Sequence, residues 1–190
     1  VRVNLPGHGI APRPVERGYT IDDFVSDVER VFVELALEPC VLVGLSMGGT
    51  AAMNLAERNP NLFKFVGSFS GYLDTTTAGM PTAIKAAQLD AGGYNVLDMW
   101  GGPFDANWAK NDPTVQVGRL KGTKLWITAS TGEPGKYTPN PSPADIVQGV
   151  PLEILAKSQS EAFKAAADKA GVSAHYDFSS VGTHTWGYWS

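Results

Sequence analysis

The segment around residues 41–58 constrains the fold more than any other part of the sequence. An apolar run, Val41–Val43, ends at the sequence GLSMGG, and small and apolar residues then follow at helical spacing up to the break at Asn59-Pro60. This pattern predicts a buried strand, a sharp Gly-x-Ser-x-Gly turn and a helix over 47–58. In that setting a strained turn pushes a serine hydroxyl out of the end of a sheet. Ser46 is therefore a candidate nucleophile, and the alternative is a small residue in a structural glycine turn.

Three further residues of this turn have predicted roles. Gly44 and Gly48 flank the serine. We predict that both positions require glycine, because side chains there would collide with the neighbouring strand and helix. Met47 begins the predicted helix, and backbone N–H groups at the start of a helix favour negative charge. The Met47 N–H is therefore the predicted donor to an oxyanion that forms next to Ser46.

The rest of the chain alternates strand-like and helix-like segments. Expected strands cover residues 1–5, 41–43, 63–69, 125–128 and 174–178, and expected helices cover 21–36, 47–58, 81–90 and 152–170. Alternation of this kind predicts an α/β fold with about five mostly parallel strands and helices on both faces, in a single domain over 1–190. Residues 130–149 are predicted to be a Pro-, Gly- and Ser-rich loop. The segment 71–118 is predicted to be an irregular cover over the site, and Trp100 and Trp108 are expected mainly to pack that segment.

An activated serine needs a base, and the sequence offers three histidines. His184 follows the last expected strand, where the base lies in the chain order Ser, acid, His. His8 lies in a Pro-Gly-His-Gly loop and is a weaker candidate. His175 lies inside the last strand and is expected to be structural. We predict that His184 is the base because the carboxyl ends of parallel strands meet at one edge of the sheet, where Ser46 also lies.

The acid that orients this histidine stays open between two glutamates when position alone is considered. Glu133 follows the fourth expected strand closely and is the residue that position favours. Glu153 lies at the start of the long helix, where an acidic residue can also simply complement the helix dipole.

Several stretches of the chain resemble the antigen 85 family of mycolyltransferases. They are GLSMGG, FKFVGSFSGYL, GGYNVLDMWGGPFDANWAKNDPTVQVGRL, LWITASTG and GTHTWGYW, in the same order over about three quarters of the chain. The resemblance implies an α/β-hydrolase fold and a Ser–Glu–His triad. It assigns the nucleophile to Ser46, the base to His184 in GTHTW, and the acid to Glu153 in VPLEIL, so it favours Glu153 over Glu133.

The first 45 residues resemble general α/β-hydrolase esterases instead, through VNLPGHG, YTIDDFVSDVERVF and PCVLVGLSMGG. In that superfamily the loop after an earlier strand supplies the second oxyanion N–H. That strand has no counterpart here, so we expect a truncated α/β-hydrolase fold. Residues 1–5 are then expected to pair with 41–44 and to place Gly7 beside the elbow as the second oxyanion donor, with a plain turn as the alternative. The free edge of strand 1–5 would permit a homodimer.

Charge and composition argue against several classes of partner. The formal net charge is −4, and Lys and Arg are scattered, which is not the pattern of a nucleic-acid binder. No apolar stretch reaches the roughly 20 residues needed to cross a bilayer, so stable membrane insertion is not expected. Cys40 is the only cysteine and is expected to be a buried, inert thiol. No metal or organic cofactor is implied. No leader sequence is visible, although the resembled family is exported.

These observations predict a serine carboxylic-ester hydrolase that acts on a small-molecule ester or an acyl lipid. The first alternative is a mycolyl-type acyltransferase, in which a sugar hydroxyl replaces water, although the residues that hold trehalose in that family have no match here. The second is a non-catalytic binding protein on a hydrolase scaffold. Trp186 and Trp189 flank the region of His184 and would either line an acyl pocket or anchor the tail.

Overall fold

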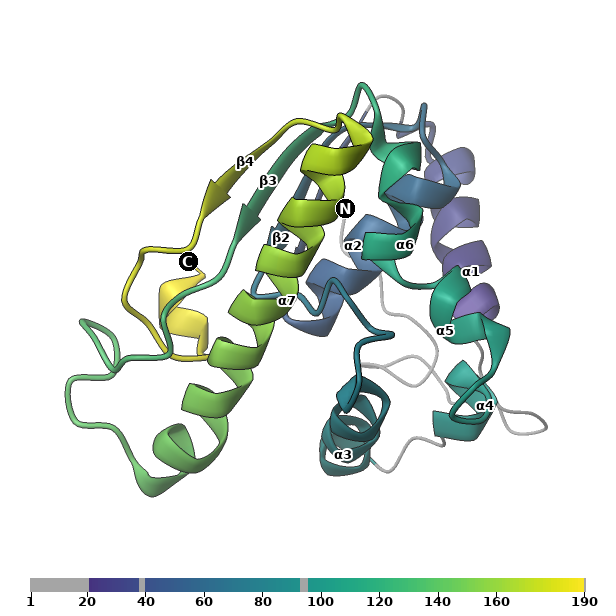
Figure 1. The fold of residues 1–190 in the computed structure, drawn as a ribbon. Helices are drawn as coiled ribbons and strands as arrows, with labels where there is room; N and C mark the ends of the chain where they lie inside the picture. Colours follow the sequence, from purple (N-terminus) through teal and green to yellow (C-terminus); the bar gives the residue numbers. More distant parts are fainter. Residues whose placement is uncertain (1–20, 38–39, 93–95, 190) are drawn as a thin grey trace. The chain divides into compact units, whose positions relative to one another are not determined.

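A computed structural model describes residues 21–37, 40–92 and 96–189 (Figure 1). The strand expected at 1–5, with its pairing and its dimer edge, lies outside the described residues, and so do Gly7 and His8. The chain divides into two compact units. The smaller unit comprises the described parts of 1–38 and 77–108, and the larger comprises the described parts of 39–76 and 109–190.

The larger unit is built on a sheet of four parallel strands whose order in space follows the chain. The strands are β1 (Cys40–Leu45), β2 (Phe63–Phe69), β3 (Lys124–Thr128) and β4 (Ala174–Asp177). Each strand coincides with an expected one, to within two residues at either end. Because all four run in the same direction, their carboxyl ends share one edge of the sheet, and the residues that follow them are brought together there.

Helices of this unit pack against the sheet and against one another (Figure 1). They are α2 (Met47–Arg58), α6 (Pro113–Gln116), the 3-10 turns Val117–Leu120 and Trp186–Tyr188, and α7 (Val150–Ala170). A π-helical turn, Asp145–Gly149, runs directly into α7. The interpretation of 130–149 as loop throughout was therefore wrong for its last five residues. α7 ends at Ala170 and is followed by Gly171, whose φ of 71° is the left-handed conformation that glycine adopts without strain.

The two faces of the sheet differ in burial because successive side chains of a strand point to opposite sides. Val66, Leu125 and Ile127 are buried on the face where α2 and α7 contact the strands. On the other face Val43 and Trp126 are exposed. The His175 ring contacts the Trp126 ring at a tilt, with centroids 3.9 Å apart, so this histidine belongs to the sheet surface, as its position in the strand predicted.

The smaller unit is helical. Its elements are α1 (Ile21–Glu34), α3 (Met80–Gly92), α4 (Val96–Trp100) and most of α5 (Ala106–Lys110). The segment 71–118 is thus more helical than its Gly-rich sequence indicates. Trp100 and Trp108 are buried and stack with centroids 4.6 Å apart, so they pack this segment as expected. That the segment covers the site stays a prediction.

Two composition-based expectations can be compared with the described residues. No helix in the described ranges is long and apolar enough to cross a membrane. The described residues also contain no cluster of His, Cys, Asp and Glu that could hold a metal ion. The thiol of Cys40 is half-buried rather than buried, and its Sγ lies 3.8 Å from the Leu62 carbonyl oxygen.

Glu57 is a buried acid of α2 with no hydrogen-bond partner for either carboxylate oxygen among the described residues. It is 2% exposed. Burial raises the pKa of Glu57 well above its ordinary value, and the nearby Asp112 carboxylate raises it further, while Arg119 and Arg58 act in the opposite direction. An acid with a raised pKa in the folded state adds stability below its unfolded pKa, and that stability is lost as pH rises through the folded pKa.

We therefore expect Glu57→Gln to raise the melting temperature at pH 8 by a few degrees and to have a much smaller effect at pH 4. The glutamine keeps the shape of the side chain but cannot ionise, and about 1 kcal/mol moves the melting temperature of a chain this long by about 2–4 °C. Thermal melts of wild type and variant between pH 4 and pH 9 measure the difference. Glu161→Gln, at an exposed position of α7, is the matched control. A difference in melting temperature between wild type and Glu57→Gln that does not increase with pH would contradict the raised pKa of Glu57.

Candidate active site

Ser46 occupies a strained turn between β1 and α2. Its φ is 53° and its ψ is −128°, a conformation that non-glycine residues rarely adopt. Two backbone hydrogen bonds stabilise it. The Ser46 N–H donates to the Phe69 carbonyl oxygen at the end of β2, at 2.8 Å, and the Gly49 N–H donates to the Ser46 carbonyl oxygen, also at 2.8 Å. The turn is thereby attached to the neighbouring strand, and the serine is held at the edge of the sheet.

Of the two glycines expected to be required in this turn, the structure confirms Gly44 but not Gly48. A Cβ on Gly44 would lie 1.9 Å from the Gly48 carbonyl oxygen, which is impossible without moving the backbone. A Cβ on Gly48 meets no heavy atom of the described residues within 4 Å, so the expected collision at Gly48 was wrong. Gly49 is the second close-packed glycine, because its Cβ would lie 2.6 Å from the Ser68 Oγ and 3.1 Å from the Cα of Gly71.

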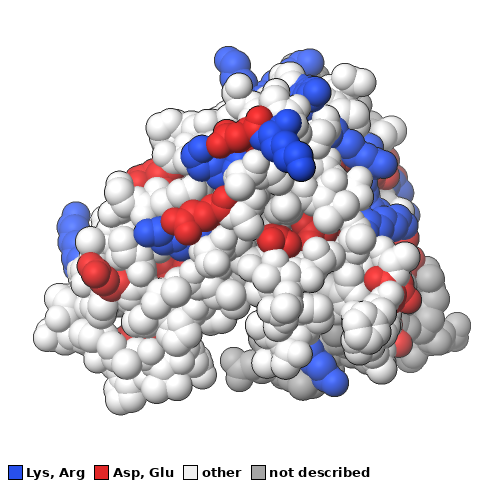
Figure 2. Space-filling model, in the orientation of Figure 1, with Lys and Arg blue, Asp and Glu red and all other residues white. Residues whose placement is uncertain are grey.

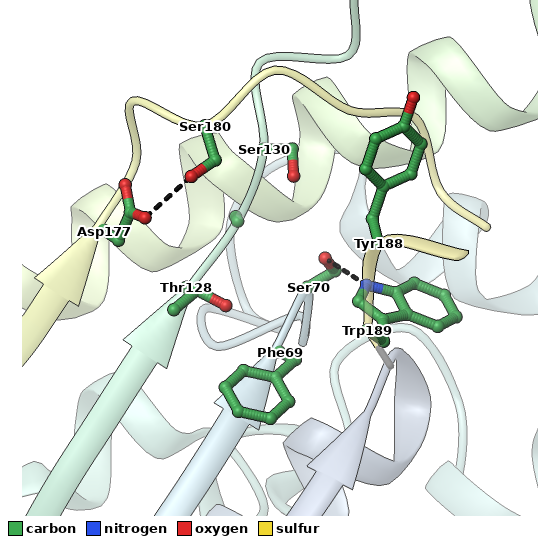
Figure 3. A pocket seen from close by; sticks show the side chains of 9 residues that line it. Phe69, Ser70, Thr128, Ser130, Asp177, Ser180, Tyr188 and Trp189 are labelled. Atoms are coloured by element: carbon green, nitrogen blue, oxygen red, sulfur yellow. Dashed lines mark hydrogen bonds between the residues drawn. The ribbon is translucent and has the colours of Figure 1, made fainter. Parts of the chain in front are cut away.

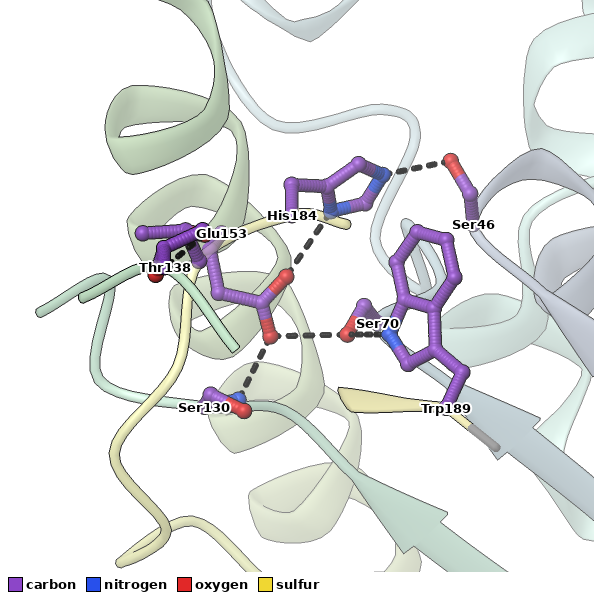
Figure 4. Close-up of polar contacts among 8 residues, drawn as sticks. Ser46, Ser70, Ser130, Thr138, Glu153, His184 and Trp189 are labelled. Atoms are coloured by element: carbon purple, nitrogen blue, oxygen red, sulfur yellow. Dashed lines mark hydrogen bonds and ion pairs between the residues drawn. The ribbon is translucent and has the colours of Figure 1, made fainter. Parts of the chain in front are cut away.

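His184 bridges Ser46 and Glu153 (Figure 4). Its Nε2 lies 2.7 Å from the Ser46 Oγ, and its Nδ1 lies 2.8 Å from the Glu153 Oε2. The loop that carries the histidine is attached to the start of α7, since the His184 N–H donates to the Gly149 carbonyl oxygen at 3.1 Å. The three side chains come from β1–α2, α7 and the tail after β4, so only the folded sheet brings them together.

Glu153 is fully buried and hydrogen-bonded at both carboxylate oxygens. Besides the contact with His184, its Oε1 accepts from the Ser70 Oγ at 2.7 Å and from the Ser130 N–H at 2.5 Å. The Trp189 Nε1–H donates in turn to the Ser70 Oγ at 3.0 Å. A buried carboxylate is stabilised when charged donors or several hydrogen bonds replace its hydration. Here two neutral donors and the histidine do so.

The sequence analysis missed these supporting residues. Ser70 directly follows β2 and Ser130 lies two positions after β3, so the rule that placed Ser46 and His184 at the carboxyl ends of strands also applies to them. Nothing in the sequence distinguished them from other serines in turns. Glu133, the acid that position alone favoured, is exposed, and its N–H donates to the Thr131 Oγ1 in its own loop at 3.3 Å.

Two aromatic rings flank the imidazole. The ring of Tyr72 lies parallel to that of His184 with centroids 6.4 Å apart, and the Trp189 indole meets it edge-on at 4.8 Å. Burial, together with the Glu153 carboxylate, raises the pKa of Tyr72 to about 12, so the phenol stays neutral across the physiological range. Trp189 therefore anchors the tail to the site through Ser70, whereas Trp186 is exposed.

The tail after β4 is also attached to the loop that follows β3. The Tyr188 hydroxyl accepts from the Gly135 N–H and hydrogen-bonds with the Thr138 Oγ1, both at 2.8 Å. The Thr131 N–H donates to the Ser180 carbonyl oxygen at 2.9 Å. These contacts hold the tail, which carries His184, against the loop after β3.

The first N–H groups of a helix have no carbonyl partner within the helix. Met47 is the first residue of α2 and directly follows Ser46, so its N–H lies at the position expected of an oxyanion donor. Gly7, the expected second donor, lies outside the described residues.

A cavity of about 240 Å³ lies next to the acid rather than the nucleophile (Figure 3). It is lined by residues at the carboxyl ends of β2, β3 and β4 and by the tail, namely Phe69, Ser70, Thr128, Ala129, Ser130, Asp177, Ser180, Tyr188 and Trp189. Ser46 and His184 are not among these lining residues. The cavity borders Ser70 and Ser130, the two donors to Glu153 Oε1.

Comparison with known proteins places the chain in a family. The family named Esterase, described as "Putative esterase", matches residues 21–190. The protein named diacylglycerol acyltransferase/mycolyltransferase Ag85A of Mycobacterium leprae is 41% identical over 149 residues, which are 77% of this chain and 44% of that protein. The protein of the corresponding name, Ag85C, from Mycobacterium avium is 37% identical over 150 residues, 78% of this chain and 42% of the relative. The chain thus spans less than half the length of these curated relatives.

Solved structures agree with the fold. The crystal structure of Mycobacterium tuberculosis MPT51 (FbpC1) superposes with a TM-score of 0.71 at 28% identity, over 89% of this chain and 62% of that one. Staphylococcus aureus FphF, described as a fluorophosphonate-binding serine hydrolase, superposes with a TM-score of 0.59 at 13% identity, over 88% of this chain and 58% of the other, which supports the fold alone. The chain belongs to the esterase family, with antigen 85 acyltransferases among its relatives and part of the α/β-hydrolase fold as its architecture.

Proposed function

We propose that this protein is a serine carboxylic-ester hydrolase that works through an acyl-enzyme on Ser46. The observation that carries the proposal is the unbroken series of contacts from the Ser46 Oγ through His184 to the buried carboxylate of Glu153. A nucleophile in contact with a base that is itself oriented by a third group is the arrangement expected of covalent acyl transfer. Membership of the esterase family supports the same chemistry.

In the first half-reaction the Ser46 Oγ attacks the carbonyl carbon of the ester while the His184 Nε2 takes the hydroxyl proton. Glu153 accepts a hydrogen bond from the Nδ1–H, which selects the tautomer that leaves Nε2 free to act as a base. The tetrahedral intermediate carries its negative charge on the former carbonyl oxygen, towards which the Met47 N–H donates. The bond to the alcohol oxygen then breaks, and His184 returns the proton to that oxygen.

In the second half-reaction a water molecule attacks the acyl-enzyme. His184 takes a proton from the water, a second tetrahedral intermediate forms, and the bond to the Ser46 Oγ breaks as the proton returns to that oxygen. The carboxylic acid is released, and the Ser46 hydroxyl is regenerated. Gly7 remains the proposed second oxyanion donor.

Ser70 and Ser130 act as positioning residues in this proposal. Their donors engage the Glu153 Oε1, which leaves Oε2 directed at the imidazole. Since a shift of about 1 Å at a reacting group can lower a rate by two orders of magnitude, the orientation of the acid contributes to the rate although neither serine contacts the substrate.

Acyl transfer to a sugar hydroxyl is the second candidate function. The observation that favours it is the identity of 41% with a relative named diacylglycerol acyltransferase/mycolyltransferase. The acyl-enzyme would form in the same way, and an alcohol would replace water in the second half-reaction. The two functions therefore differ only in the acceptor.

The experiment that tests the proposal has two readouts. Intact mass is measured after exposure to a fluorophosphonate, and release of p-nitrophenol is followed from esters of graded chain length with and without trehalose. Stoichiometric labelling with hydrolysis supports the esterase, and acylated trehalose as the main product supports the transferase. A well-folded protein that neither labels nor turns over ester would contradict both and leave a non-catalytic binding protein on a hydrolase scaffold.

A further inference from the structure

Exposed apolar side chains lie on the segments that flank His184. These side chains are large and 46–72% exposed: Tyr137, Ile146, Val147, Ile154, Val181 and Trp186. We refer to these six residues as the apolar collar. Scattered exposed apolar residues are ordinary on proteins, but a contiguous group beside a site marks an interaction surface.

Close contacts join the three segments that carry the collar. The Gly187 Cα is so near Tyr137 that an added Cβ would lie 2.6 Å from the tyrosine Cβ. An added Cβ on Gly135 would lie 3.0 Å from Val181, and one on Gly132 would lie 2.7 Å from Ile154. The loop after β3, the start of α7 and the tail after β4 therefore meet, and the collar residues lie on neighbouring segments.

The collar is attached directly to the candidate catalytic histidine. Gly149, two residues after Val147, accepts the hydrogen bond from the His184 N–H at 3.1 Å. Trp186 lies two residues after His184 in the tail. A molecule that covers the collar is therefore placed next to the contact between His184 and Ser46.

Few charges lie on this part of the surface. Between residues 136 and 156 the side chains with acidic or basic charge are Lys136, Asp145 and Glu153. Glu153 is fully buried, and the exposed Lys136 lies over the Tyr137 ring, with its Nζ 5.0 Å from the ring centroid. Hydrogen bonds from the Ser142 side chain and N–H lower the pKa of Asp145, so it is anionic at neutral pH. Figure 2 shows nearly all of the visible surface at this end of α7 in white, whereas Lys, Arg, Asp and Glu are grouped over other parts of the molecule.

We propose that the apolar collar docks the enzyme on the uncharged surface of aggregated lipid esters, such as a neutral bilayer or an ester droplet. This inference rests on the proposed esterase function and names the physical form of its substrate. An uncharged partner fits because the collar offers apolar contact, and the two charges beside it, Lys136 and Asp145, have opposite signs and so favour neither an anionic nor a cationic surface. Tyr and Trp are the side chains that favour a lipid–water boundary, because their rings are apolar and their polar groups stay hydrated.

The position of the collar favours a lipid surface over a protein partner. A protein bound across these residues would obstruct access to His184, whereas a lipid surface supplies the ester itself. Docking there shortens the path that an insoluble ester must travel out of its aggregate to reach Ser46.

The test is co-sedimentation with phosphatidylcholine vesicles, with Trp fluorescence as a second readout. The full chain is used in three variants: Val147→Ser, Trp186→Ser, and Val115→Ser as the matched control. Val115 is 54% exposed on α6 and is not a member of the collar. Each collar substitution should weaken vesicle binding about tenfold, because it removes about two buried methyl groups or more. The control should bind like wild type.

Several outcomes would overturn the inference. These are no binding to phosphatidylcholine, equal weakening by Val115→Ser, or binding that requires phosphatidylglycerol in the vesicles. A melting curve like that of wild type excludes misfolding of a variant. If one of the two collar variants misfolds, the other still tests the inference. Fluorophosphonate labelling and hydrolysis of a soluble short-chain ester test the proposed function separately. Vesicle binding without labelling would contradict the proposed function but not the docking role of the collar. Labelling and hydrolysis without vesicle binding would contradict the docking role alone.

Discussion

Ser46→Ala is expected to abolish fluorophosphonate labelling and to lower ester turnover by about four to six orders of magnitude. Alanine removes the only atom that can form the acyl-enzyme, and loss of one member of a catalytic unit costs nearly as much as loss of the whole unit. The His184 imidazole would then lack the hydroxyl that lies 2.7 Å from its Nε2. Intact mass and the rate of p-nitrophenol release at saturating ester measure the two effects.

The control for this prediction is Ser158→Ala, at an exposed position of α7 that carries no proposed role. It should label and turn over ester like wild type. Alanine at position 46 has to adopt the same positive φ as serine, so the melting temperature of the variant should stay close to that of wild type. If Ser46→Ala were still labelled, another residue would be the nucleophile and the proposed mechanism would be refuted.

Glu153→Gln is expected to lower kcat/KM by about four orders of magnitude while the protein remains folded. The glutamine oxygen can still accept from Ser70 and Ser130, so the buried network is largely kept. Its NH₂ group then faces the Nδ1 of His184 and favours the tautomer with the proton on Nε2, which cannot act as a base. In the Ser-His-Asp proteases used as the general template, the corresponding Asp→Asn change lowers kcat by about 10⁴.

Glu133→Gln is the matched control, because Glu133 is the acid that position alone favoured. It is exposed in the loop after β3 and should leave the kinetics unchanged. The two variants are compared over the same range of pH, because the loss in Glu153→Gln should persist where the imidazole of wild type is neutral. A large loss in Glu133→Gln with little change in Glu153→Gln would exchange the roles of the two residues.

Local pattern was sufficient for the strands and the two long helices of the larger unit. The helix expected at 47–58 and the strand expected at 63–69 have the bounds of α2 and β2, because both are long enough to show a clear period and both end at turn-forming residues. The π-helical turn at Asp145–Gly149 was not predicted, because prolines at 139, 141 and 143 dominate the local pattern and give no sign of where the helix resumes.

The candidate site was predictable in part. Strand-to-loop positions nominated Ser46 and His184, and resemblance decided for Glu153, where position alone had favoured Glu133. The supporting donors Ser70, Ser130 and Trp189 could not be chosen from sequence, because a serine that donates to a buried acid has the same local surroundings as a serine in any turn.

By itself the sequence determined the strand–turn–helix segment around Ser46 and the alternation of strands and helices, and it nominated Ser46 and His184 as candidates, because each of these follows from a local pattern of residue type and period. Tertiary structure decided what depends on distance across the chain. It placed His184 against a serine 138 positions away, required a glycine at position 49 rather than 48, and gathered six apolar side chains from three segments into the collar. These outcomes depend on which elements pack together, and close packing acts between residues that the sequence keeps far apart.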